Sequence, residues 1–194
     1  MSKYVEKHSL GKDAARGFCY SQLRRNDFLY GHHIVIAGAL GDVLWLRRYG
    51  AMGMIVACDK ARTPRLAAQQ LGQHMCSLSP HPLIEDTVEW YLSHFGARPL
   101  SSISIDLCNT VIEAAGVLGN VLTTLARYDR RGKVRVFLTY TRGFKDGFRD
   151  DRTRIDYLNA MLVSTNTSID PGLVFNYQSY TAKSVGAPMT VITV

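Results

Sequence analysis

Short apolar runs alternate with amphipathic segments along most of the chain. Apolar, mostly β-branched runs predict buried strands over 33–37, 54–58, 103–107 and 134–140, and a weaker run predicts one over 74–78. Apolar residues at three- and four-residue spacing predict helices over 42–49, 64–71, 83–95, 111–128 and 152–163. Because strands and helices alternate, the pattern predicts right-handed βαβ units and an α/β fold with a doubly wound, mostly parallel sheet.

The two ends of the chain differ from this pattern. Between 12 and 29, apolar and basic residues alternate at helical spacing, which predicts one or two helices in a basic N-terminal extension over 1–32. This extension would pack on a single domain over 33–194. At the other end, the alternating, aromatic segment 173–180 and the β-branched segment 189–194 predict an antiparallel hairpin, with Lys183, Gly186 and Pro188 between its strands.

Length and composition fit one soluble globular domain. The chain has 194 residues, of which 46% are hydrophobic and 20% are charged. No apolar run approaches the roughly 20 residues of a membrane span, and no signal peptide is visible. Four cysteines without regular spacing indicate reduced thiols, so we expect a cytoplasmic protein without membrane contact.

The charge balance favours a polyanionic partner. There are 23 basic and 16 acidic residues, a net charge of +7. Such a surplus is typical of nucleic-acid binding, although solubility alone also explains it. Arg142 and Lys145 follow the last parallel strand in a basic segment with interleaved Phe144 and Phe148, which suits phosphate contacts and base stacking. Nearby aspartates nearly cancel this local charge, so a salt-bridged loop is an equal alternative.

A small-residue loop follows the first strand. It reads Ala37-Gly38-Ala39-Leu40-Gly41-Asp42, and such residues let the backbone turn sharply and approach a ligand. About twenty residues further on, the second strand ends at Asp59, where a carboxylate can accept hydrogen bonds from both hydroxyls of a ribose. The full G-x-G-x-x-G fingerprint is absent, and a simple tight turn is the alternative.

The layout resembles the class I S-adenosylmethionine-dependent methyltransferases over about residues 33–194. Their sheet has seven strands, the last two forming an antiparallel hairpin. The resemblance therefore implies a Rossmann-like sheet of about seven strands and S-adenosylmethionine as the cofactor. It also implies cofactor-binding positions at Ala37, Gly38, Ala39, Gly41, Asp59, Ser77 and Leu78. Two of the family's three loop glycines are alanine here.

The resemblance also implies a site beside the transferred methyl group, at Asp106, Leu107, Cys108 and Asn109. Asp106 and Asn109 would orient the acceptor there, although strand-end residues of these types also cap turns. The run lacks the prolines and aromatic residue of amino-methylating DNA enzymes and the Pro-Cys of carbon-5 cytosine enzymes. A ribose 2′-O enzyme, with Asp106 and Lys145 in its set, matches only loosely. Cys108 fits a buried structural thiol better than a nucleophile.

The sequence thus predicts methyl transfer, with nucleic acid as the first-choice acceptor and Arg142 and Lys145 holding phosphate. A small-molecule or protein methyltransferase and a non-catalytic nucleic-acid-binding or scaffold subunit remain alternatives. A nicotinamide-dependent oxidoreductase is a further one, against which the hairpin speaks. The histidines and cysteines match no standard zinc spacing, so no metal is expected. The compact chain suggests a homo-oligomer, a partner subunit or a viral setting.

Overall fold

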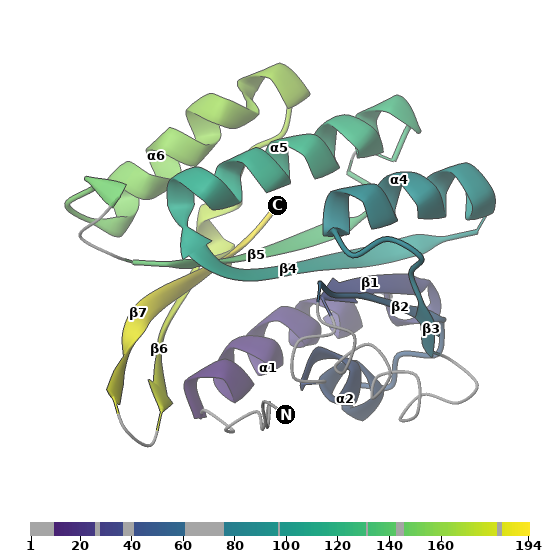
Figure 1. Cartoon of the computed structure of the whole chain (residues 1–194), viewed down its shortest axis with the longest axis horizontal. Coiled ribbons are helices and arrows are strands. Elements are labelled where there is room, and N and C mark those ends of the chain that lie inside the picture. Colours follow the sequence, from purple (N-terminus) through teal and green to yellow (C-terminus); the bar gives the residue numbers. More distant parts are fainter. Residues whose placement is uncertain are drawn as a thin grey trace.

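One mixed sheet organises the molecule. The computed structural model describes residues 10–25, 28–36, 41–60, 76–96, 98–130, 132–142, 146–181 and 184–194. These form seven strands in the order β3-β2-β1-β4-β5-β7-β6 (Figure 1). The strands are β1 (His32–Ile36), β2 (Ile55–Cys58), β3 (Cys76–Leu78), β4 (Leu100–Thr110), β5 (Arg135–Thr141), β6 (Phe175–Thr181) and β7 (Ser184–Thr193). β1 to β5 pair in parallel, and β7 runs antiparallel to both β5 and β6, so the predicted sheet and hairpin are confirmed.

Helices cover both faces of this sheet. α1 (Leu10–Arg25) and α2 (Gly41–Arg48) lie on one face, and α4 (Ile84–Phe95), α5 (Val111–Arg127) and α6 (Asp151–Leu162) lie on the other (Figure 1). Short 3-10 turns occur at η1 (Phe28–Tyr30), η3 (Val163–Thr165) and η4 (Pro171–Leu173). The helix predicted over 64–71 lies outside the described residues. No helix in the described ranges has the length and apolarity needed to cross a membrane.

Strand alternation divides the core into two layers. In β1, Ile34 belongs to the apolar cluster under α4, α5 and α6, whereas its neighbour Val35 belongs to the cluster under α1 and α2. In β5, Leu138 and Phe137 divide in the same way. Because successive strand side chains point to opposite faces, a continuous apolar run fills both layers at once. This is why β2 is apolar at every position, whereas β4 alternates, with Ser102 and Ser104 on one face and Ile103 and Ile105 on the other.

Two helices begin at side-chain caps that the sequence encodes locally. Thr110 and Glu113 form a reciprocal capping box at the start of α5, and the Asp150 side chain accepts from the Thr153 N–H at the start of α6. Each cap satisfies backbone donors that a helix leaves open in its first turn. α4 follows Leu83 without a side-chain cap.

Two predicted strands are too short. β4 runs from Leu100 to Thr110 rather than over 103–107, so Asn109 lies within the strand as Asp106 does, in a stretch where the pairing with β5 is irregular. The second hairpin strand starts at Ser184 rather than at 189 and includes Pro188. Pro188 pairs with Gln178 directly beside a register shift, which is where a residue without an N–H can enter a sheet.

Candidate active site at the carboxyl edge

The carboxyl ends of β1, β2 and β4 meet at one edge of the sheet. In the strand order 3-2-1-4-5, the connections reverse direction between β1 and β4, and open α/β sheets bind ligands at such a switch point. The chain leaves β1 through residues 37–40 and enters α2 at Gly41. Asp59 follows β2 directly, and Asp106 lies in the carboxyl half of β4. Ala37, Gly38 and Ala39 lie outside the described residues.

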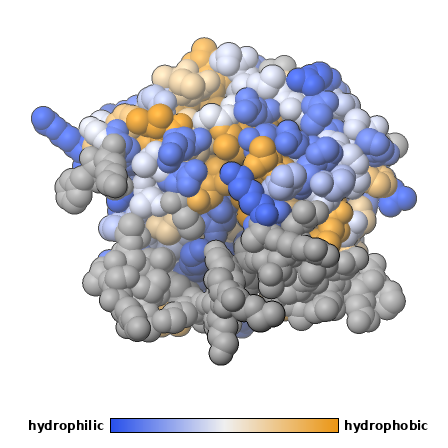
Figure 2. All heavy atoms as spheres, viewed as in Figure 1, coloured by the Kyte–Doolittle hydropathy of each residue, from blue (hydrophilic) through white to orange (hydrophobic). Residues whose placement is uncertain are grey.

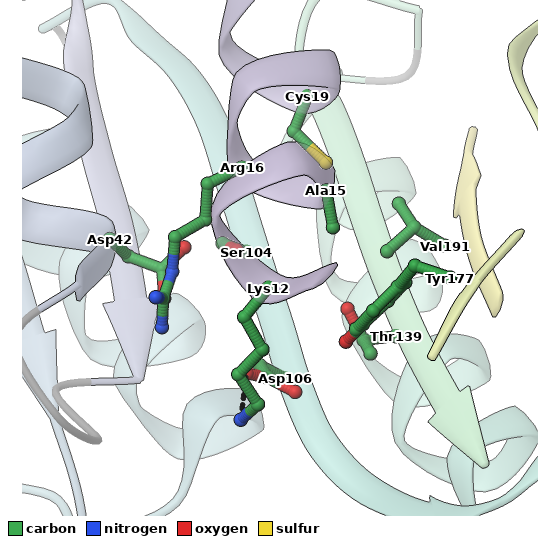
Figure 3. Close-up of a pocket in the computed structure, with 10 residues that line it drawn as sticks. All are labelled: Lys12, Ala15, Arg16, Cys19, Asp42, Ser104, Asp106, Thr139, Tyr177 and Val191. Atoms are coloured by element: carbon green, nitrogen blue, oxygen red, sulfur yellow. Dashed lines mark hydrogen bonds and ion pairs between the residues drawn. The ribbon is translucent and has the colours of Figure 1, made fainter. Parts of the chain in front are cut away.

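A small pocket lies at this edge beneath α1 (Figure 3). Its cavity volume is about 20 Å³, which is room for about one water molecule. α1 lies on one side of it, and strands β4 to β7 form most of the other. The lining residues are Lys12, Ala15, Arg16, Cys19, Asp42, Ser104, Asp106, Thr139, Tyr177 and Val191.

Ion pairs hold the first half of α1 over the pocket. The Lys12 ammonium lies 3.4 Å from an Asp106 carboxylate oxygen (Figure 3). One turn later, the Arg16 guanidinium Nε lies 3.5 Å from Asp42, which also accepts a hydrogen bond from the Tyr20 hydroxyl. Arg16 and Asp42 are both buried. Since buried charges need a partner, these contacts fix α1 against the start of α2 and the end of β4.

The close approach of Arg16 also explains a glycine in the loop. A Cβ at Gly41 would overlap the Arg16 guanidinium. Gly41 therefore lets a cation lie against the backbone at the start of α2. This is the position that the sequence assigned to the third small residue of a ligand-binding turn.

Cys19, which lines the pocket, and Tyr20, which contacts its Asp42, both stay neutral at ordinary pH. Burial raises the pKa of the Cys19 thiol well above its usual value, and the nearby Asp42 and Asp106 carboxylates raise it further. Burial likewise raises the pKa of Tyr20, with Asp42 adding to the effect. Neither group is a nucleophile in this state, so the charge at the site resides in the ion pairs.

The structure places the other predicted cofactor residues at the same side of the sheet. Asp59 is half-buried immediately after β2. Ser77 and Leu78 are half-buried in β3, opposite Val56 and Ala57 of β2. Their roles toward a cofactor stay predictions.

The structure does not bring Asn109 to the pocket with Asp106. Asn109 is exposed and is not among the residues that line the pocket. The pairing of β4 with β5 is irregular between Asp106 and Thr110, so simple alternation does not carry over along this stretch. The side chain of Cys108 lies outside the described part of the chain.

The segment after β5 is a salt-bridged loop. Arg142 lies 3.2 Å from an Asp151 oxygen, and Lys145 is outside the described residues. The buried Arg154 donates two hydrogen bonds to Asp146, at 2.9 Å and 3.2 Å. Burial opposes ionisation of Asp146, but the hydrogen bonds from Arg154 and from the Phe148 N–H hold its pKa below the usual value. Of the two interpretations that the sequence allowed, a phosphate-binding segment and a salt-bridged loop, the salt-bridged loop therefore describes the local structure.

Several pocket residues were missed by the sequence analysis. Ser104 could have been found from the sequence. It stands two positions before Asp106, and this spacing on a strand places both side chains on one face. Thr139 pairs directly with Asp106 across the β4–β5 ladder. Lys12 on α1 carries no local signal, because it is separated from Asp106 by 94 positions. Across the described ranges, no group of three or more His, Cys, Asp or Glu side chains is arranged to hold a metal ion.

Comparison with known proteins identifies the fold. No family model matches the sequence, and no curated protein is similar to it by sequence. Among solved structures, magnesium protoporphyrin IX methyltransferase from Synechocystis, with bound S-adenosylmethionine, is 13% identical with a TM-score of 0.56, covering 95% of this chain and 80% of that one. Precorrin-6y C5,15-methyltransferase from Geobacter metallireducens is 15% identical with a TM-score of 0.57, covering 100% and 90%. An O-methyltransferase from Bacillus cereus, in complex with S-adenosylhomocysteine, is 12% identical with a TM-score of 0.56, covering 93% and 81%.

These likenesses extend over nearly the whole chain. The molecule therefore has the class I, Rossmann-like methyltransferase fold, as the sequence pattern predicted.

Proposed function

We propose that the chain binds S-adenosylmethionine at the carboxyl edge of the sheet and transfers its methyl group to a small-molecule acceptor. The observation that carries this proposal is that three candidate cofactor- or acceptor-binding positions lie together at the switch point between β1 and β4. The end of β1, the acid after β2 and the acid near the end of β4 lie at one edge of a methyltransferase-like sheet. Structures with the same fold were determined with S-adenosylmethionine or S-adenosylhomocysteine, which supports this cofactor.

The residues present suit such a cofactor. We expect the half-buried Asp59 carboxylate, directly after β2, to accept hydrogen bonds from ribose hydroxyls, and half-buried Ser77 and Leu78 to contact the adenine. Gly41 already admits one cation against the backbone, which shows how closely a group can approach this turn. The cofactor supplies a methyl group activated by a sulfonium, so the chief task of the protein is to align the acceptor with it. We assign this task to Asp106, whose carboxylate lines the pocket.

We expect α1 to move at its first turns when a ligand enters the pocket beneath it. Pockets for small ligands measure about 300–1,000 Å³, whereas the cavity beneath α1 measures about 20 Å³. The described residues therefore leave no room for a nucleoside under α1. We expect the contacts of Lys12 and Arg16 to open when the cofactor or the acceptor enters.

A small acceptor fits the charges at this edge better than a nucleic acid does. Four of its cations are each paired with an aspartate: Lys12, Arg16, Arg142 and Arg154. A polyphosphate strand needs cations that are available for its phosphates. Three of the structural neighbours are named for small molecules, namely magnesium protoporphyrin IX, precorrin-6y and 1,6-didemethyltoxoflavin.

The direct test is isothermal titration calorimetry with S-adenosylmethionine, S-adenosylhomocysteine and NAD. We expect micromolar binding of the first two, lost in Asp59→Ala and kept in Asp86→Ala, which removes an exposed acid from α4. Binding of NAD in their place would overturn the proposal in favour of an oxidoreductase. Binding of none of the three would overturn it in favour of a non-catalytic relative.

The acceptor is tested by release of S-adenosylhomocysteine in the presence of defined compounds. Small phenols, amines and carboxylates are compared with single-stranded oligonucleotides. Turnover with a small compound that is lost in Asp106→Asn, while cofactor binding persists, supports the assignment of Asp106. Turnover with oligonucleotides alone would contradict a small-molecule acceptor.

A further inference from the structure

The positive charge of the molecule gathers at the edge opposite the proposed cofactor site. α1, α2, α4 and α5 each end near the amino end of the strand that follows, namely β1, β2, β4 and β5. The described segments there are 24–25, 28–31, 47–54, 94–96, 98–100, 127–130 and 132–135. Within them stand nine basic residues: Arg24, Arg25, Arg47, Arg48, Arg98, Arg127, Arg130, Lys133 and Arg135. The same segments contain one acid, Asp129, which gives a formal charge of +8. We name these nine residues the amino-edge patch.

Helix dipoles do not account for this charge. Basic residues in the last turn of a helix offset its negative end, and each of the four helices contributes about half a negative charge there. The four ends together contribute about −2, and Glu89, the partner of Arg127, contributes −1, which leaves roughly +5 at the amino-edge patch. Moreover, Arg98, Arg130, Lys133 and Arg135 lie outside the helices, in connections or at the start of β5.

Much of this charge is available to a ligand. Arg127 is paired with Glu89 and Lys133 with Asp129, while Arg47 and Arg130 donate to backbone carbonyl groups. The other five members have no ion pair with a carboxylate among the described residues: Arg24, Arg25, Arg48, Arg98 and Arg135. Three of these five guanidinium groups lie over aromatic rings, of Trp45, Phe95 and Phe28. This arrangement restrains an arginine while its N–H groups stay free to bind phosphate.

Exposed aromatic and apolar side chains lie among these cations. Tyr30 is 70% exposed and Met52 is 63% exposed. Their segments are adjacent, because the Met52 N–H donates to the Leu29 carbonyl at 2.9 Å. Arg135 lies 6.0 Å from the Phe28 ring in the same 3-10 turn as Tyr30. An exposed ring in a basic segment can stack on a base while nearby cations bind the flanking phosphates.

We infer that the amino-edge patch binds single-stranded nucleic acid. Stacking on Tyr30 requires an unpaired base, which favours a single strand over a duplex. Anionic lipid would need several inserting apolar groups besides charge, and in these segments Tyr30 and Met52 are the large apolar side chains that are exposed.

On the side of the molecule in Figure 2, apolar and hydrophilic residues are interspersed over the described surface. The seven residues of β5 separate this edge from the carboxyl edge by about 20 Å. The inference therefore does not depend on the proposed activity.

The test measures binding by fluorescence anisotropy of labelled 20-nucleotide oligo(dT) and oligo(U). A DNA duplex and anionic vesicles serve as comparators. The variant Arg24→Gln/Arg25→Gln/Arg48→Gln removes three exposed cations of the amino-edge patch. Its matched control, Lys60→Gln/Arg149→Gln/Arg152→Gln, removes three exposed cations from segments near the carboxyl ends of the strands, with the same change in net charge.

We expect wild-type protein and the control to bind the single strands similarly. The patch variant should lose at least tenfold in affinity at 50 mM salt, and its slope of log K against log salt should fall by about 2. Tyr30→Ala should weaken binding by roughly fivefold or more without changing this slope. Circular dichroism of each variant verifies that it is folded.

Three results would overturn the inference. The first is that the patch variant and the control lose the same oligonucleotide affinity, which would mean that only the net charge of the protein matters. The second is wild-type binding to vesicles but not to oligonucleotides. The third is the absence of oligonucleotide binding by the wild-type protein at 50 mM salt.

Discussion

Lys12 in the first turn of α1 and Asp106 near the end of β4 lie 3.4 Å apart across the mouth of the proposed cofactor site. Both side chains are about one-fifth exposed, so water screens their attraction only in part. The pair joins the helix that covers the pocket to the carboxylate assigned to the acceptor. Opening the site therefore separates two charges that the closed form holds together.

Removal of this pair should favour the open form. In Lys12→Met, we expect S-adenosylmethionine to bind roughly two- to fivefold more tightly, which corresponds to the loss of an ion pair worth up to about 1 kcal/mol. Calorimetry at low ionic strength measures the change, and Arg24→Met at the far end of α1 is the control. Weaker binding in Lys12→Met would mean that Lys12 contacts the ligand rather than restraining the helix.

The Asp146–Arg154 pair should dominate the stability of the segment after β5. The Asp146 side chain is fully buried and the Arg154 side chain is 7% exposed, so removing Asp146 leaves a buried guanidinium whose remaining carboxylate partner, Asp151, lies 3.5 Å away. We expect Asp146→Ala to lower the free energy of unfolding by about 3–5 kcal/mol. The double variant Asp146→Ala/Arg154→Met should cost much less than the sum of the two single changes.

Urea denaturation measures these differences. Lys133→Ala, which removes one partner of the exposed pair with Asp129, should cost less than about 1 kcal/mol. A cost of Asp146→Ala as small as that of Lys133→Ala would contradict the assignment.

The periodicity of apolar residues predicted most of the architecture, because strands and helices that alternate along the chain form neighbouring βαβ units. The parallel strands and the antiparallel hairpin follow from apolar patterning, and Asp59 was correctly placed at the end of its strand. The extension of β4 to Thr110 was not predictable, since the apolar pattern ends at Leu107 and Asn109 is a residue typical of turns. Pairing with β5 and the cap at Thr110 keep this segment in the strand.

The grouping of basic residues at the amino edge was not predicted from the sequence. The sequence analysis offered Arg142 either as a phosphate contact or as part of a salt-bridged loop, and the structure shows it paired with Asp151. Helices and strands that run in opposite directions bring residues as distant as Arg24 and Arg135 to one edge. No local pattern encodes that proximity. The cover formed by α1 has the same origin, because its partners Asp42 and Asp106 are far from it in the chain.

The capping box at Thr110 should stabilise α5 measurably. The Glu113 N–H donates to the Thr110 hydroxyl at 3.5 Å, and the Thr110 N–H donates to the Glu113 carboxylate at 3.1 Å. Thr110→Ala should lower the free energy of unfolding by about 1 kcal/mol. Thr123→Ala, at an exposed interior position of the same helix, should leave it unchanged or raise it slightly. Equal effects of the two substitutions in thermal or urea unfolding would contradict a role for the cap.

The buried His33 should make the protein less stable in acid. Its side chain is fully buried, and its Nδ1 lies 2.8 Å from the Ser102 hydroxyl. Burial lowers the pKa of His33 from 6.5 to about 4, and a backbone hydrogen bond at Leu29 opposes this less strongly. Between pH 6.5 and 4, the unfolded chain therefore binds a proton at this residue that the folded chain does not.

Stability linked to His33 is thus fully present above pH 6.5 and is lost as the pH falls toward 4, by up to about 3 kcal/mol. His33→Gln should destabilise the protein at pH 7, and the difference from wild type should shrink by about 2 kcal/mol at pH 4.5. Urea unfolding at both pH values measures this change, with His94→Gln at an exposed position of α4 as the control. Because other acids titrate equally in both proteins, their contributions cancel in the comparison. A difference between wild type and His33→Gln that is the same at pH 7 and pH 4.5 would show that His33 takes up its proton as readily in the folded protein as in the unfolded chain.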